Sequence, residues 1–172
     1  AEVRNLSEFA GALALDKWTC NANGRQALFH RKGRERRYTA AFIDQGFCFN
    51  AGEWRFIDAP LRGVYARNLV YSEITGWGSF EPWLTRIEQL EPERIWGIVE
   101  GVPPEWYEGD AEVLERLIEK LIERRTQVRP LITSFRDSSR RPFPNWNRPP
   151  ASPAGGRFPA PDWTDRVQGG VQ

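Results

Sequence analysis

Two clusters of polar residues have the types and spacing that could do chemistry. They occupy residues 21–26 and 44–50, and the runs between them, 28–31 and 38–43, have the composition of β-strands. Gly33 suits a hairpin turn, so pairing of these runs would place Asp44 beside the 21–26 loop. A carboxylate is the hard oxygen ligand that magnesium prefers, which makes Asp44 a candidate metal ligand. The structural alternative is a turn aspartate that accepts bonds from local amides.

The 21–26 loop contains groups that could hold or orient a substrate. Asn23 can hydrogen-bond an acceptor hydroxyl but cannot take up its proton, and Gln26 has the same limit. Arg25 could contact phosphate oxygens through its forked donors, or it could form a salt bridge with Asp16. Asn21 is expected to fix the loop backbone. These groups could therefore bind and orient a substrate, but they supply no evident base.

The same residues carry a resemblance to a known family. The string WTCNANGRQ, followed by the hairpin and by FIDQGFCF, resembles the catalytic loop and metal-binding segment of HipA-like kinases, atypical kinases related to phosphatidylinositol kinases. The resemblance covers about residues 16–60, and PLRGVYARN and PPEWYEGD extend it to about residue 136. It implies the C-terminal lobe of a protein-kinase-like fold, with magnesium and ATP as cofactors. It also implies an N-terminal kinase lobe, missing from these residues, as a partner.

The resemblance carries over residue by residue. Asp44 with Gly46 matches the metal-binding part of the family pattern. Asn23 stands where the family has its catalytic aspartate, and Leu28 where it has a second metal-ligand asparagine. The resemblance therefore implies a fragment or a degenerate form of an ATP- and magnesium-dependent phosphotransferase that acts on a protein or lipid hydroxyl. These departures, and the lack of a glycine-rich loop and strand lysine ahead of the segment, predict no phosphoryl transfer by this chain alone. Together with the chemistry of the loop residues, we therefore predict catalytic positions at Asn23, Arg25 and Gln26, cofactor binding at Asn21 and metal binding at Asp44.

Length and composition limit the other possibilities. The chain has 172 residues, which suits one domain with a tail, and its 24 Lys and Arg against 23 Asp and Glu give a net charge of +1. This balance offers no overall electrostatic case for binding nucleic acid or an anionic membrane. No apolar run reaches the roughly 20 residues of a membrane span, and no signal peptide is visible, so we expect a cytoplasmic protein. The absence of Met indicates a processed or partial chain.

Other reactive or charged residues favour structural roles. Cys20 and Cys48 are expected to be small buried hydrophobes, with a redox pair at the open end of the hairpin as the alternative. His30 is expected to be exposed or packed rather than a base. The basic cluster at 31–37 is interpreted as a solvated hairpin tip, because Glu35 interrupts it and only one turn is involved. Nucleic-acid binding is therefore not favoured.

The remaining pattern predicts a mainly α protein. A helix capped by Asn5 should end near Asp16, and further helices are predicted at 64–75, 80–90 and 92–100. Asp110 should cap a helix whose apolar stripe faces the core, or alternatively a partner helix, and Pro130 should end or kink it. The kinase-like lobe would thus occupy residues 1–139, with the catalytic-loop-like segment at 16–50 and the helical part at 64–135. The stripe consists of Val113, Leu114, Leu117, Ile118, Leu121 and Ile122.

Residues 140–172 differ in composition from the rest of the chain. They contain many prolines and glycines without a helix or strand period, which predicts an extended proline-rich tail. The tail is either disordered or lies along a partner through the aromatic anchors Phe143, Trp146, Phe158 and Trp163. The alternative function is therefore a non-catalytic scaffold or accessory subunit that docks into a larger protein assembly through this tail.

Overall fold

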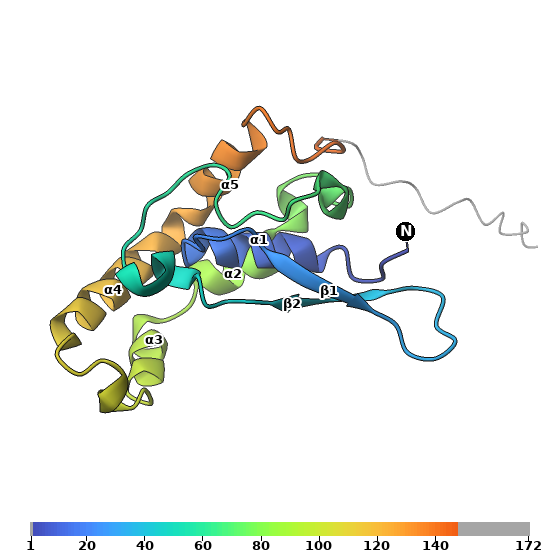
Figure 1. The fold of residues 1–172 in the computed structure, drawn as a ribbon. Coiled ribbons are helices and arrows are strands. Elements are labelled where there is room, and N and C mark those ends of the chain that lie inside the picture. The colour runs from blue at the N-terminus through green and yellow to red at the C-terminus, as the bar shows by residue number, and fades with distance from the viewer. Residues whose placement is uncertain (1, 148–172) are drawn as a thin grey trace, which may run out of the picture.

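The structure, a computed structural model, describes residues 2–147. Helices dominate this part of the chain, and one two-stranded antiparallel sheet accompanies them, as the sequence predicts (Figure 1). Short 3-10 turns connect several of these elements. None of the helices in residues 2–147 is long and apolar enough to cross a membrane. In chain order the elements are α1 Glu8–Trp18, β1 Gln26–His30, β2 Thr39–Ile43, α2 Glu81–Glu88, α3 Pro92–Val99, α4 Ala111–Glu123 and α5 Val128–Arg136.

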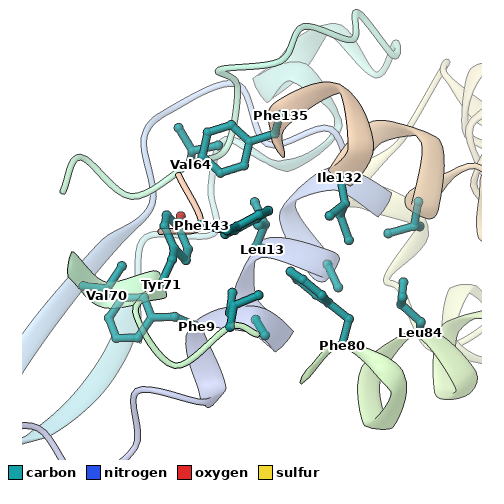
Figure 2. Close-up of a cluster of buried hydrophobic side chains, with 14 of the residues drawn as sticks. Phe9, Leu13, Val64, Val70, Tyr71, Phe80, Leu84, Ile132, Phe135 and Phe143 are labelled. Atoms are coloured by element: carbon teal, nitrogen blue, oxygen red, sulfur yellow. The ribbon is translucent and has the colours of Figure 1, made fainter. Parts of the chain in front are cut away.

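Helix α1 lies at the centre of the fold and makes contacts with both α2 and α5. Its sequence combines small residues with large apolar ones, and Phe9, Ala10, Leu13 and Ala14 are all buried. Phe9 packs edge to face against Phe42 of β2 at 4.9 Å between ring centroids, which fixes the hairpin on this helix. Figure 2 shows the aromatic and aliphatic side chains that surround Leu13. The helix is therefore buried on several sides and can hold its last residues, and the loop after them, in a fixed place.

The hairpin has the predicted strands but a longer connection. Gln26 pairs with Ile43 and His30 with Thr39 in an antiparallel register, and residues 31–38 form the loop. Gly33 has φ 51° in a turn closed by a 3.0 Å bond from the Glu35 amide to the Lys32 carbonyl. This conformation favours glycine. The loop extends away from the helices (Figure 1).

Asn5 does not cap α1, which is a correction to the sequence prediction. The N-cap is Ser7, and it makes no side-chain capping bond. The Asn5 side chain instead donates to the Ala40 carbonyl and accepts from the Ala40 amide, both at 2.9 Å. This residue thus satisfies the edge of β2, where a neighbouring strand would otherwise pair.

Of the predicted helices, the one at 64–75 is wrong. Only Asn68–Tyr71 forms a short 3-10 turn there. The Tyr65 amide donates to the Tyr71 hydroxyl at 2.9 Å, and Arg140 donates to the Tyr65 and Ala66 carbonyls. The Arg140 side chain therefore satisfies two carbonyls that a helix would have paired internally. Helices α2 and α3 agree with the predicted segments 80–90 and 92–100.

Helix α4 has the buried stripe that the sequence predicts, with Leu117, Ile118 and Leu121 all buried. Asp110 is its N-cap but makes no side-chain capping bond, so the predicted cap is wrong. Pro130 does not end this helix either. Helix α4 ends at Glu123, a 3-10 turn spans Arg124–Thr126, and the proline lies in the first turn of α5, where its missing amide is tolerated.

The predicted boundary at residue 139 is also wrong. Phe143 is only 7% exposed, and its ring contacts those of Tyr71, Phe80 and Phe135 at 5.7 to 5.8 Å between centroids (Figure 2). Trp146 stacks on Phe143 at 5.4 Å, and the Asn147 amide donates to the Thr75 carbonyl. Residues 140–147 therefore complete the core. The other two proposed anchors, Phe158 and Trp163, lie outside the described residues.

Candidate functional site

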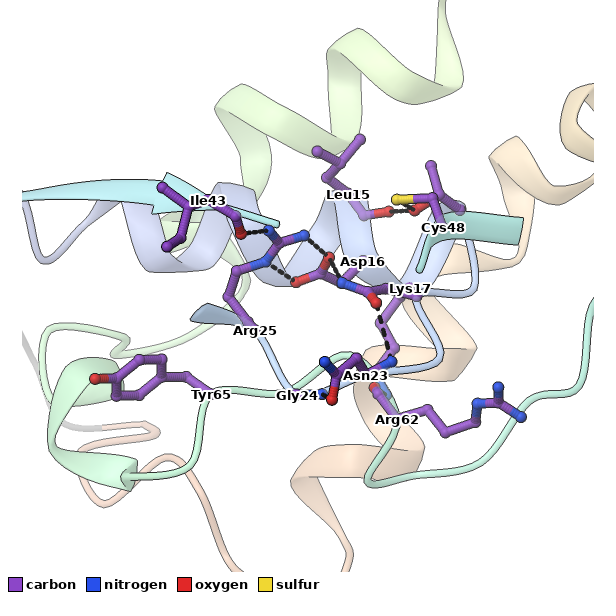
Figure 3. A network of polar contacts seen from close by, with 12 residues as sticks. Leu15, Asp16, Lys17, Asn23, Gly24, Arg25, Ile43, Cys48, Arg62 and Tyr65 are labelled. Carbon is purple, nitrogen blue, oxygen red and sulfur yellow. Dashed lines mark hydrogen bonds and ion pairs between the residues drawn. The ribbon is translucent and has the colours of Figure 1, made fainter. Parts of the chain in front are cut away.

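A buried carboxylate at the end of α1 anchors the loop between α1 and β1. Asp16 accepts a 2.8 Å bond from Nε of Arg25, a second bond from Nη2 of the same guanidinium, and a 2.9 Å bond from Nδ2 of Asn21 (Figure 3). Nη1 of Arg25 donates to the Ile43 carbonyl at 3.0 Å. The helix, the loop and the end of β2 are thereby joined through one guanidinium.

This geometry decides between the two interpretations of Arg25. Its side chain is 2% exposed, and each of its three nitrogens donates to Asp16 or to Ile43. The salt bridge, not a phosphate contact, is what the structure shows. Burial raises the pKa of the Asp16 carboxyl, and the hydrogen bonds from Arg25 and Asn21 oppose that shift. The bond to Asp16 in turn raises the pKa of Arg25.

The loop also depends on a close glycine. Gly63 has φ 68°, and a Cβ atom at this position would lie 2.8 Å from Cβ of Asp16 and 3.3 Å from Cβ of Asn21. Glycine is needed here for both the backbone conformation and the space. The segment after Pro60 thus packs directly against Asp16. The Arg25 amide also donates to the neighbouring Val64 carbonyl at 3.1 Å.

Lys17 ties this same segment to the end of α1. Its Nζ donates to the carbonyls of Ala59, Pro60 and Arg62 at 3.3, 2.9 and 2.7 Å. The side chain is buried, and desolvation lowers the pKa of Lys17 to about 8, although nearby carboxylates oppose the shift. A buried ammonium group therefore holds the segment that covers the loop.

Arg124 supports α1 from far along the chain, and sequence reasoning missed it. Its guanidinium donates to the carbonyls of Lys17 and Trp18 at 2.7 and 2.9 Å, pairs with Asp58, and lies 4.4 Å from the Phe56 ring centroid. These carbonyls lie at the C-terminal end of α1, where a cation is favourable. The available signal was its position: Arg124 follows Leu117 and Leu121 at helical spacing on the buried stripe.

We call the buried network of Asp16, Asn21 and Arg25 the loop frame. The predicted polar residues Asn23, Gln26 and Asp44 lie on its solvent-accessible side. The Asn23 amide N–H donates to Oδ1 of Asn21 at 3.0 Å, and Oδ1 of Asn23 accepts from the Gly24 amide at 2.8 Å. Nε2 of Gln26 donates to Oδ2 of Asp44 at 2.7 Å. The predicted placement of Asp44 beside the 21–26 loop is confirmed. Gln26 and Asp44 are exposed and Asn23 is half-buried, so solvent reaches all three.

The predicted metal centre offers few ligands. Asp44 supplies a carboxylate, but residues 2–147 contain no group of three or more His, Cys, Asp and Glu side chains that could hold a metal ion. Leu28, the position at which the sequence resemblance predicts a second metal-ligand asparagine, is 58% exposed on β1 and supplies no oxygen ligand. Magnesium bound here would have to take most of its ligands from water or from phosphate oxygens, as this ion often does.

The two cysteines are free thiols. Sγ of Cys48 accepts a 3.3 Å bond from Oγ1 of Thr19, and Sγ of Cys20 donates to the Ile57 carbonyl at 3.4 Å. Burial raises the pKa of the Cys48 thiol, which disfavours the reactive thiolate. The geometry agrees with the interpretation of both residues as packed side chains.

Comparison of the chain with protein-family models, with curated proteins and with solved structures gives no match.

Proposed function

We propose that this protein is a kinase-related protein, a degenerate form of an ATP- and magnesium-dependent phosphotransferase that acts on a protein or lipid hydroxyl, and that this chain alone does not transfer phosphate. The observation that carries the proposal is that the loop frame is intact and buried, whereas the exposed groups that it holds lack a catalytic acid. Asp16, Asn21 and Arg25 form a buried network that holds the loop beside Asp44. Asn23, at the position of the acid in the related kinases, has an amide instead.

The chemistry follows from what these groups can and cannot do. Phosphoryl transfer needs magnesium, a group that orients or deprotonates the acceptor hydroxyl, and a clamp over the nucleotide. Asp44 provides one oxygen ligand on the solvent-accessible side of the frame. The Asn23 amide can orient a hydroxyl but cannot accept its proton. The proposed site can thus bind magnesium with phosphate but lacks a base.

Binding is tested by amide NMR titration of the protein with magnesium and ATP. We expect saturable shifts in residues 21–26 and 44–46, and we expect Asp44→Asn to abolish them. Asp110→Asn, which removes an exposed carboxylate at the start of α4, is the matched control and should leave the shifts unchanged. If the amides of these two segments do not shift, the proposed binding of magnesium and ATP at this site is contradicted.

Transfer is tested separately with labelled ATP, magnesium and mixed protein and lipid acceptors. We expect no labelled product. Asn23→Asp restores an acid but no nucleotide clamp, so it should not restore transfer in this chain alone. Transfer by the unmodified protein that Asp44→Ala abolishes would show that the site is active and would overturn the proposed lack of catalysis.

The scaffold alternative has less support after the fold is known. Phe143 and Trp146 were two of its four docking anchors, but Phe143 is buried in the core and Trp146 packs against it. It now depends on Phe158 and Trp163. A pull-down from source cells with both of these replaced by alanine would test it, since large aromatic anchors dominate interface energy. Unchanged recovery of partners would remove this alternative.

A further inference from the structure

A cavity of about 370 Å³ lies between α1, α2 and the end of β2, elements that pack side by side in Figure 1. Its size is within the range of small-molecule sites, which are concave and mostly apolar with a few polar groups. Four charged or polar side chains also line it: Glu8, Arg25, Gln45 and Arg86. Its apolar wall is formed by Gly11, Ala12 and Leu15 of α1, Phe42 of β2, and Trp83 and Ile87 of α2.

The shape of the cavity depends on a glycine and an unusually exposed leucine. A Cβ atom at Gly11 would lie 2.6 Å from two carbons of the Trp83 indole, so the ring packs directly on the backbone of α1. Farther along α1, Leu15 is 38% exposed although it faces other apolar side chains. The indole and this leucine thus present apolar surface that a flat ligand could cover.

The charged side chains around the cavity differ in whether they already have a hydrogen-bond or ion-pair partner. Arg25 borders it but is neutralised by Asp16, and Glu8 accepts a 2.7 Å bond from Nδ2 of Asn5. Arg86 lies 5.6 Å from the Trp83 ring centroid and makes no ion pair with any of residues 2–147. A guanidinium that can donate two hydrogen bonds to a carboxylate therefore lies over the Trp83 ring at the edge of the cavity.

We propose that this cavity binds a small planar aromatic carboxylate, with its ring against Trp83 and Leu15 and its carboxylate on Arg86. Because α1 covers one face of the indole and Arg86 lies over the ring, the ligand ring would pack against the indole edge, an edge-to-face geometry that aromatic pairs favour, and a charge-assisted pair at the mouth fixes orientation. The site does not use Asn23 or Asp44, so it stands independently of the proposed kinase relationship. Because Arg25 and Gln45 also line the cavity, the bound molecule would touch the back of the loop frame.

The test compares three probes of the same ring by amide NMR titration of the full chain: 2-naphthoate, neutral 2-naphthamide and cationic 2-naphthylmethylamine. We expect saturable shifts at Gly11, Ala12 and Leu15, and naphthoate binding about fivefold tighter than naphthamide, the effect of one partly exposed charge pair. The amine should bind most weakly. Equal affinity for naphthoate and naphthamide, tighter binding of the amine, or shifts that map elsewhere would overturn the proposal.

Variants separate the charge from the cavity. Arg86→Gln should bind naphthoate and naphthamide equally, whereas Arg94→Gln, an exposed arginine on α3, should keep the fivefold preference. Ala12→Phe should fill the cavity and abolish binding of both probes. If that variant does not fold, the comparison of Arg86→Gln with Arg94→Gln still decides the result. A preference for naphthoate that survives in Arg86→Gln would contradict the assigned contact.

Discussion

Replacing Arg25 by methionine should destabilise the protein by about 3 to 5 kcal/mol, because it leaves a buried carboxylate without its counter-charge. Both partners of the pair are enclosed, with side-chain exposures of 2% for Arg25 and 0% for Asp16. The substitution also removes the donor to the Ile43 carbonyl, and Asn21 would remain as the donor to the carboxylate. Methionine keeps much of the apolar length of the side chain, so the loss reports mainly on the charge.

The size of this effect is large against the stability of a domain. Folded proteins are stable by about 5 to 15 kcal/mol in total, so the variant would lose about a fifth of its stability or more. Burial already raises the pKa of Asp16, and without Arg25 this pKa should rise further. The folded variant would then bind a proton that the unfolded chain releases above about pH 4, so lowering the pH from 7 toward 5 should recover part of the loss.

The assay is denaturant unfolding followed by tryptophan fluorescence, with a surface pair as the control. Arg116 and Glu112 lie 3.6 Å apart with side chains that are 62% and 88% exposed, and Arg116→Met should cost under about 1 kcal/mol. Combining Arg25→Met with Asp16→Asn should cost less than the sum of the two single changes. Equal midpoints for Arg25→Met and Arg116→Met, or additive single changes, would refute the reasoning.

Three further predictions follow from the packing. Because burial lowers the pKa of Lys17 to about 8 while the unfolded side chain keeps its proton to about 10.5, the free energy of unfolding should rise between these pH values, by up to about 1.4 kcal/mol per unit. Lys17→Met should lack this rise. Deleting residues 141–172 should destabilise the protein by about 3 kcal/mol or more, as loss of a packed aromatic ring at Phe143 does. Leu117→Ala should cost about 2 to 5 kcal/mol and the exposed Glu119→Ala far less.

Each of these predictions has a clear contrary result. The Lys17 side chain can be followed by NMR of its Cε atom, and titration of Lys17 near its ordinary pKa of about 10.5 would contradict the first. An unchanged thermal midpoint after the deletion would show that residues 141–147 are not needed by the core. Similar denaturation midpoints for Leu117→Ala and the unmodified protein would show that the α4 stripe does not carry stability.

Local pattern was sufficient for the parts of the fold that depend on neighbours in the chain. The apolar stripe of α4 and the strand composition around Gly33 identified a helix face and a hairpin. The hairpin in turn placed Asp44 beside the 21–26 loop, because antiparallel pairing brings the two strand ends together. The salt bridge between Asp16 and Arg25 was one of two alternatives that their residue types allowed, and the sequence could not choose between them.

The tertiary structure decided the features that join distant residues. Phe143 and Trp146 belong to a proline-rich segment whose composition indicates an extended tail. The space between Tyr71, Phe80 and Phe135 nevertheless buries Phe143, and Trp146 packs half-buried against Phe143 and Phe80. Residues 64–75 were expected to be helical, but the Arg140 guanidinium donates hydrogen bonds to the Tyr65 and Ala66 carbonyls instead. Arg124 reaches the end of α1 across 107 positions of sequence. Composition and periodicity describe short windows, whereas burial of an aromatic ring or a guanidinium depends on which elements meet around it.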